Sequence, residues 1–122
     1  MKILSWNIRG LNGSHKQEVV RNMIRDQRPD VFLIQETKMK KENIEKVSFG
    51  KDMKNMAIDS DGALGGLLSI WKESLEANII FNEGNIFLMN FFNPKDHVRL
   101  FLLNLYAPNT RNSRRILWTN FF

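Results

Sequence analysis

The chain has 122 residues, which is enough for one domain or for part of a larger one, but too few for two domains of ordinary size. It contains no cysteine, and this excludes a disulfide framework, a thiolate metal site and a cysteine nucleophile. The first residues lack the apolar stretch of a signal peptide, and no apolar run approaches the roughly 20 residues that span a membrane. With 43% hydrophobic and 25% charged residues, the chain can form a core. We therefore expect an intracellular globular protein, nuclear or cytoplasmic, with no membrane partner.

The net charge of +5 is unevenly distributed along the chain. Asp96 is the last acidic residue, so no carboxylate accompanies the arginines that follow it. Basic clusters attract phosphates and nucleic acids through the field that they generate. Taken alone, a modest positive charge is more simply explained by a solvated surface. The two basic clusters are Arg99, Arg111, Arg114 and Arg115 near the end of the chain, and Lys38, Lys40 and Lys41 after Glu36.

The first elements predicted along the chain are a strand and a helix. Lys2–Ile8 is short and apolar and leads into a loop, as expected of a strand. A helix with one apolar face follows, and Asn12 or Ser14 is its expected capping residue. Arg28 and Pro29 end this helix, because a residue that precedes proline is disfavoured in the helical conformation.

The next segment completes a strand–helix–strand unit. Val31–Ile34 is a continuous apolar run, which is typical of a strand buried on both faces. A strand, a helix and a strand in this order favour a parallel pair of strands joined by a crossover helix. A short, strongly charged helix is predicted next, around Lys41–Val47.

The second half of the chain is predicted to be rich in strands joined by short turns, which indicates antiparallel hairpins. The last strand is apolar on both faces, so the sheet that contains it must be covered on both sides. The sequence therefore predicts the α/β (α+β) class, with a mixed β-sheet and no second domain. The four predicted strands are Leu67–Trp71, Ala77–Phe81, Ile86–Phe92 and Val98–Tyr106.

The end of the sequence is predicted to be a helix over Thr110–Phe122, capped by Asn109 or Thr110. Its apolar residues continue to the last two positions, Phe121 and Phe122. Because chain termini are usually polar and loosely held, we expect that the sequence is the N-terminal portion of a larger domain. Loss of the remainder would expose apolar surface, and self-association is then expected.

Polar residues stand at or just after the ends of three of the predicted strands. They are Asn7, Glu36, Tyr106 and Asn109. If the strands run in the same direction, these side chains meet at one edge of the sheet, where ligands of open α/β sheets bind. One carboxylate and two amides suit a hard cation such as Mg²⁺, which keeps several waters or substrate phosphates. Ordinary strand-end residues with satisfied hydrogen bonds are the alternative reading.

Three motifs resemble those of the endonuclease/exonuclease/phosphatase superfamily, which has the DNase I-like fold. They lie in the order of that family, in the segments Lys2–Asn12, Arg28–Lys38 and Asn104–Asn109. The resemblance implies part of a four-layer αββα sandwich, truncated in this chain. The sequence, including Gly65–Trp71, is most similar to the apurinic-type endonuclease domain of plant LINE-type (non-LTR) retrotransposon polyproteins.

The resemblance also implies a role for each matching residue. Glu36 and Asn7 would bind the metal, which is Mg²⁺ in the family with Mn²⁺ as the alternative. Tyr106 and Asn7 would act as catalytic residues at the scissile phosphate, and the implied reaction is hydrolysis of a DNA phosphodiester. Contacts with nucleic acid are implied for Asn109, Lys38 and Arg111.

The aspartate and histidine motifs that activate water in this family have no counterpart at the matching place in the sequence. Asp96 and His97 precede a predicted strand in a turn and stand before the third motif, so they are not a substitute. His15 is expected to be solvated. Without a general base the reaction lacks its proton chemistry, and we expect the 122 residues alone to be inactive.

Three functions remain open at this point. The first is part of a retrotransposon-type endonuclease, whose parent polyprotein carries a reverse transcriptase domain and nicks DNA. The second is a non-catalytic nucleic-acid-binding remnant, and the third is a phosphatase with the same fold, since folds are reused for different substrates.

Overall fold

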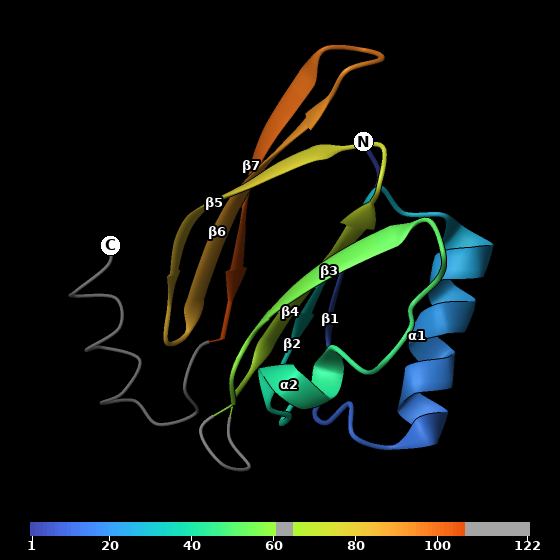
Figure 1. The fold of residues 1–122 in the computed structure, drawn as a ribbon, viewed down its shortest axis with the longest axis vertical. Coiled ribbons are helices and arrows are strands. Elements are labelled where there is room, and N and C mark those ends of the chain that lie inside the picture. The colour runs from blue at the N-terminus through green and yellow to red at the C-terminus, as the bar shows by residue number, and fades with distance from the viewer. Residues whose placement is uncertain (61–64, 107–122) are drawn as a thin grey trace.

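The computed structural model describes residues 1–60 and 65–106, which form two β-sheets with two helices (Figure 1). The predicted helix over residues 110–122 lies outside this described part. The helices are α1 (Ser14–Gln27) and α2 (Lys41–Ile44). The strands are β1 (Ile3–Asn7), β2 (Val31–Gln35), β3 (Met53–Ile58), β4 (Leu67–Lys72), β5 (Glu76–Glu83), β6 (Ile86–Asn93) and β7 (Val98–Leu105).

The first sheet is mixed and has the strand order β1-β2-β4-β3. β1 and β2 are parallel and joined through α1, whereas β4 is antiparallel to both of its neighbours. Val31–Ile34 in β2 is buried throughout, as its continuous apolar run predicts, because this strand has a neighbour on each side and a layer on each face. The predicted parallel pair with a crossover helix is therefore confirmed.

The second sheet is an antiparallel meander of β5, β6 and β7. Short turns join β5 to β6 and β6 to β7, so the antiparallel hairpins predicted from the sequence are confirmed. Leu102 and Asn104 face the first sheet, whereas Phe101 and Leu103 face outward, with exposed fractions of 62% and 37%. The sequence pattern indicates one sheet, but the strands form two sheets, because β4 pairs with β2 and β3 whereas β5 pairs with β6.

Three local predictions differ from the structure. Gly13 occupies the N-cap position of α1 and no side chain caps the helix, so neither Asn12 nor Ser14 has that role. The second helix ends at Ile44, earlier than expected. β3 was not predicted from the sequence, because its lysine, asparagine and methionines do not form an apolar or strictly alternating run, and it lies at the edge of its sheet.

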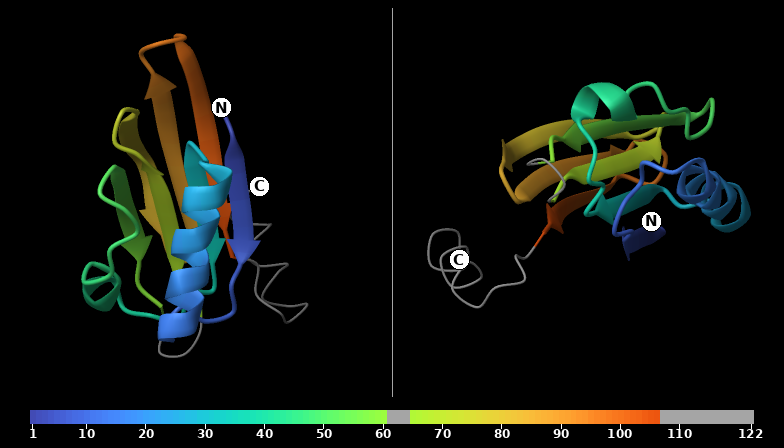
Figure 2. Two further views of the ribbon diagram at one scale, coloured as in Figure 1. Left: turned by 90° about the vertical axis from the view of Figure 1, so that its right-hand side faces the viewer. Right: turned by 90° about the horizontal axis from the view of Figure 1, so that it is seen from below.

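The molecule is layered as helix, sheet and sheet, with an apolar cluster between each pair of layers (Figure 1). Figure 2 shows α1 lying along the strands on one face of the first sheet, with the second sheet behind it. Between the sheets, the rings of Trp71 and Phe91 lie 5.7 Å apart. These layers confirm the predicted fold class. Within the described residues, no helix has the length and apolar character needed to cross a membrane.

Candidate functional site

The candidate site lies where β1 and β2 end. Their parallel pairing continues beyond both strands, because Gly10 N–H donates to the Glu36 carbonyl (2.8 Å) and Leu11 N–H to the Thr37 carbonyl (2.9 Å). The two loops are therefore held side by side. At the start of these loops the Asn7 side-chain amide donates to Glu36 Oε1 over 3.3 Å. The structure thus brings together the two residues predicted to bind a metal.

The backbone at this edge is strained. Arg9, Glu36 and Lys38 have φ angles of 54°, 55° and 54°, which place them in the left-handed region. Residues with a Cβ are disfavoured there by roughly 1–2 kcal/mol each. Five such non-glycine residues occur in the described chain, and three of them belong to these two loops. Strain of this kind is concentrated at functional sites.

Gly65 and Gly66 hold the loop after β2 from its other side. Lys38 N–H donates to the Gly65 carbonyl (2.9 Å), and Thr37 N–H donates to the Gly66 carbonyl (3.1 Å). A Cβ on Gly66 would lie 2.2 Å from the buried Thr37 Oγ1, and Gly66 has φ +93°. Only glycine fits this position, so the pair of glycines sets the conformation of the loop that contains Glu36 and Lys38.

Tyr106 joins the site through Gly65. Its ring lies 3.6 Å from the position of a Cβ on Gly65, and its N–H donates to the Asn85 carbonyl over 3.0 Å. Tyr106 is half-buried between the sheets. Gly65 therefore lies between Lys38, whose N–H donates to its carbonyl, and the ring of Tyr106.

The buried amide of Asn104 fixes the end of β7 against the first sheet. Its Nδ2 donates to the carbonyls of Ile34 (3.2 Å) and Leu68 (3.0 Å), and its Oδ1 accepts from Gln35 Nε2 (2.9 Å). Gln35 also donates to Ser5 Oγ over 3.2 Å. These bonds span both sheets directly beneath the candidate site. Within the described residues, every buried side-chain nitrogen and oxygen has a hydrogen-bond partner.

The lysines after β2 have different surroundings. Lys38 is exposed, and its Cδ lies 4.0 Å from the position of a Cβ on Gly10, so its side chain borders the loop after β1. Lys40 instead donates from Nζ to the Ser60 carbonyl over 2.8 Å. Only the first of them therefore belongs to the candidate site. Asn109 and Arg111, the other predicted nucleic-acid contacts, lie outside the described residues.

The structure separates His97 from the site. His97 lies in the turn before β7, with its N–H donating to the Asn93 carbonyl, whereas Tyr106 follows the other end of that strand. A strand of this length separates its ends by roughly 25 Å. His97 is thus excluded as a base for chemistry at Glu36, as its place in the sequence predicts. His15 lies exposed in the first turn of α1.

The chemistry available at this edge comes from oxygen atoms. The Glu36 carboxylate and the Asn7 amide oxygen are suitable ligands for a hard divalent cation. No group of three or more acidic or histidine side chains able to hold a metal is present in residues 1–60 and 65–106. The residues present therefore fit an ion that takes most of its remaining ligands from water or from a phosphate.

Sequence reasoning missed two supports of the site. Asn104 was recognised as part of a motif, but its role in joining the sheets was not predicted. The signal was its inward-facing position in an otherwise apolar strand, since a buried amide must find partners. Thr37 was missed as well, and its fully buried position beside Gly66 follows only from the three-dimensional contact.

Three solved structures are similar to this chain in fold. The AP endonuclease LMAP from Leishmania major superposes with a TM-score of 0.75 at 18% identity, covering 96% of this chain and 43% of that one. The 3′ phosphatase NExo from Neisseria, bound to a product DNA hairpin, gives 0.59 at 16% identity, covering 89% and 42%. The human Nocturnin catalytic domain with a bound sulfate gives 0.60 at 9% identity, covering 98% and 56%. The chain thus spans about half the length of these structures or less.

At these identities the structural likeness establishes the fold alone. A search among curated proteins gives no match. The sequence profile of the Endonuclease/Exonuclease/phosphatase family, however, matches residues 4–113. This range includes the second and third motifs, all but the first two residues of the first motif, and every residue assigned to the candidate site. The chain therefore belongs to the endonuclease/exonuclease/phosphatase family.

Proposed function

We propose that the chain supplies the metal-binding and phosphate-binding half of a nuclease that hydrolyses DNA phosphodiester bonds. The observation that carries this proposal is the hydrogen bond between the Asn7 amide and the Glu36 carboxylate at the adjoining ends of β1 and β2. Membership of the family supports a phosphoester substrate. The AP endonuclease, and the NExo structure with its DNA hairpin, support DNA as the partner.

In this proposal the side chains have distinct roles. Glu36 and Asn7 provide two oxygen ligands for a divalent cation, with Mg²⁺ as the expected ion and Mn²⁺ as a substitute. The family is generally dependent on divalent metals, and such an ion supplies charge stabilisation at phosphate oxygens. Tyr106 contacts the scissile phosphate through its hydroxyl. Lys38 contributes a positive charge to neighbouring phosphates.

We further propose an origin in a LINE-type retrotransposon polyprotein of the plant type. The sequence supports this origin, because it is most similar to that group and its segment from Gly65 to Trp71 fits the group as well. In the parent protein, the nuclease would nick target DNA and a reverse transcriptase domain would extend the exposed 3′ end. In this setting Asn109 and Arg111 are expected to contact DNA.

The metal site is tested without an activity assay. Substoichiometric Mn²⁺ added to ¹⁵N-labelled protein should broaden the amide signals of Asn7, Glu36 and Lys38 first. Glu36→Gln should abolish this broadening, because one carboxylate carries most of the attraction. Glu73→Gln is the matched control, since Glu73 is exposed at the opposite end of the first sheet. Unchanged broadening in Glu36→Gln would refute the metal site.

Hydrolysis is tested separately. The 122-residue chain alone is expected not to nick supercoiled plasmid in the presence of Mg²⁺, because the aspartate and histidine motifs of the family have no counterpart in the sequence and His97 is remote from Glu36. Nicking that disappears in Glu36→Ala would overturn the expected inactivity and would establish the nuclease directly. Nicking that persists in Glu36→Ala indicates a contaminating nuclease. The protein is then purified further and the nicking assay is repeated.

Two other functions each have an observation in their favour. Binding of nucleic acid without hydrolysis is favoured by the lack of a multi-carboxylate cluster in the described chain. It predicts affinity for duplex DNA that falls steeply with salt and is weakened by Lys38→Gln but not by Lys95→Gln.

A phosphatase is favoured by the 3′ phosphatase among the structural neighbours. It predicts that a terminal phosphate is released from DNA whose internal bonds remain intact.

A further inference from the structure

A second site lies at the opposite end of the first sheet from Glu36. A pocket of about 410 Å³ opens between the C-terminal half of α1 and the segment that leads into β3. Arg28 and Pro29, which line it, precede β2, whereas Glu36 follows that strand. The length of β2 places the two sites roughly 17 Å apart. The pocket is thus separate from the candidate nuclease site.

The floor of this pocket is apolar. Ile24 and Phe49 are exposed by only 9% and 3% and belong to the core between α1 and the first sheet. Met53 is half-buried against the same cluster, and Pro29 is buried beside it. Ligand pockets of a few hundred cubic ångströms commonly combine such an apolar floor with a small number of polar groups.

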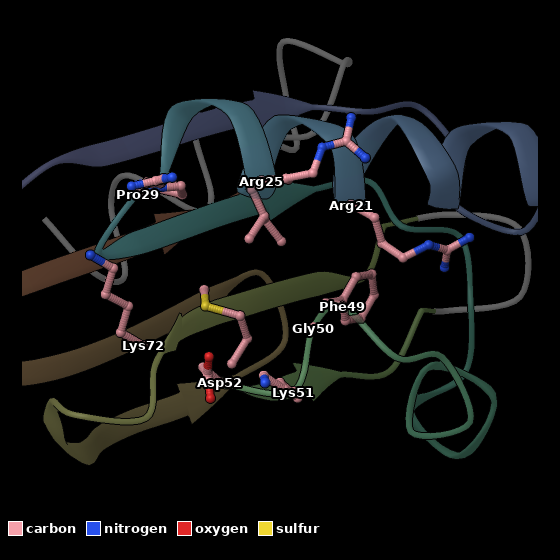
Figure 3. A pocket seen from close by; sticks show the side chains of 11 residues that line it. Arg21, Arg25, Pro29, Phe49, Gly50, Lys51, Asp52 and Lys72 are labelled. Atoms are coloured by element: carbon pink, nitrogen blue, oxygen red, sulfur yellow. The ribbon is translucent and has the colours of Figure 1, made fainter.

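The rim of the pocket is strongly cationic. Figure 3 shows Arg21 and Arg25 projecting from α1 on one side, with Lys51 and Asp52 on the other. Asp52 is the sole carboxylate that lines this pocket. The five cations of the rim are Arg21, Arg25, Arg28, Lys51 and Lys72.

Most of this charge is not neutralised within the described chain. Arg25 pairs with Asp26 at 3.2 Å, but both side chains are largely exposed, so the pair is weak. Lys72 pairs with Asp30 at 3.4 Å. The remaining three cations have no ion pair in residues 1–60 and 65–106. These three are Arg21, Arg28 and Lys51.

The combination of floor and rim defines the chemistry of the ligand. A ligand that fits needs a compact apolar body to cover the floor and an anionic group to meet the rim. Inorganic phosphate would leave the apolar floor wet, and an uncharged aromatic ring would leave the cations unpaired. A nucleoside phosphate meets both requirements, because its base is flat and its phosphate accepts from several guanidinium and ammonium groups.

We propose that this pocket binds a nucleoside phosphate, either as a free mononucleotide or as the phosphorylated end of a nucleic-acid strand. The two sources share one chemistry, a base adjoining a terminal phosphate. The site is independent of the proposed nuclease chemistry, since none of its residues contacts Asn7 or Glu36. Its occupation and the function at Glu36 can therefore succeed or fail separately.

The experiment is a titration of the 122-residue chain with AMP, adenosine, ribose 5-phosphate and inorganic phosphate. Binding is measured by calorimetry and by the changes in amide chemical shifts. AMP should bind at least about five-fold more tightly than each of the other three, because only AMP uses both floor and rim. The shifts should lie in residues 21–28 and 49–53. A 5′-phosphorylated oligoadenylate, compared with AMP, identifies which source of the shared chemistry binds more tightly.

Matched variants separate a built site from general charge. Arg28→Gln with Lys51→Gln should weaken AMP binding about five-fold or more, whereas Lys46→Gln with Lys95→Gln removes the same charge elsewhere and should change it less than about two-fold. Asp52→Asn should strengthen binding about two-fold, a gain that misfolding cannot produce. Glu36→Gln should leave it unchanged.

Three results would overturn the proposal. The first is equal weakening by the two double variants, which would show only general electrostatic attraction. The second is inorganic phosphate binding as tightly as AMP, which would remove the role of the apolar floor. The third is a set of AMP-induced shifts confined to Asn7, Glu36 and Lys38.

Discussion

At the scale of single residues, one buried amide joins the two sheets below the candidate site. Asn104 is fully buried and makes three hydrogen bonds, two to backbone carbonyls of the first sheet and one to Gln35. Gln35 immediately precedes Glu36. The position of the Glu36 carboxylate therefore depends on hydrogen bonds made by two uncharged amides, those of Asn104 and Gln35.

Asn104→Ala is expected to reduce the free energy of unfolding by about 2–3 kcal/mol, because the two backbone carbonyls and the Gln35 amide each lose one hydrogen bond in a buried place. Urea denaturation monitored by circular dichroism measures this loss. Asn90→Ala is the control, since Asn90 lies on the outer face of β6 and makes an exposed bond to Arg99. Equal losses for the two variants would contradict the bridging role.

A second residue-scale prediction concerns the glycines beside Glu36. Gly66→Ala is expected to destabilise the fold by about 2–4 kcal/mol, because it adds a steric clash with Thr37 to the backbone strain of a positive φ. Gly84→Ala isolates the strain alone, since Gly84 has φ +58° and open space around its Cβ position. Gly84→Ala should reduce the free energy of unfolding by about 1 kcal/mol. Chemical denaturation compares both, and equal costs would show that the contact with Thr37 is unimportant.

At the scale of elements, the sequence was informative where the apolar pattern was strong. β2 was predicted from four consecutive apolar residues, and β7 from its two apolar faces. β3 was missed because an edge strand needs only partial burial, so its sequence keeps a lysine and an asparagine. The capping of α1 was wrong since Gly13, which has no side chain to donate or accept, takes the position that Asn12 or Ser14 was expected to fill.

The candidate site was predictable to a similar extent. Polar residues after two parallel strands must meet at one edge, and the contact between Asn7 and Glu36 follows from this rule. The support from Gly66 and Asn104 could not be predicted in the same way. It depends on how β4 and β7 approach β2, and this approach is decided by packing between layers rather than by the pattern of any one strand.

The outer face of β7 gives an element-scale prediction. Within the described residues, Phe101 and Leu103 face outward without cover. The 122-residue chain is expected to self-associate at micromolar concentration through this face, and Phe101→Gln with Leu103→Gln should shift it toward monomer. Sedimentation velocity measures the change.

Ile80→Gln serves as the control for this double variant, because it removes an exposed apolar side chain from β5 at the other edge of the second sheet. It should leave the self-association largely intact. A wild-type chain that sediments as a monomer, or a control that dissociates as fully as the double variant, would contradict the assignment to β7.

At the scale of the whole molecule, the two sheets share one apolar layer. Trp71 and Phe91 meet across it, and Asn104 crosses it. The sheets are therefore expected to unfold together in one transition. Native-state hydrogen exchange should give the same free energy of opening for the central strands β2 and β6, because the apolar layer between the sheets is complete only when both sheets are folded. A markedly lower value for β6 would mean that the second sheet opens alone.

The left-handed backbone at Glu36 has a consequence for how this sequence would change over generations. Glycine adopts that conformation freely, so Glu36→Gly should unfold at a higher urea concentration than Glu36→Ala. Lineages retained only for their ability to fold would accumulate glycine here. A glutamate kept at this strained position would then record selection for something other than stability. If Glu36→Gly proves no more stable than Glu36→Ala, the residue carries no such record.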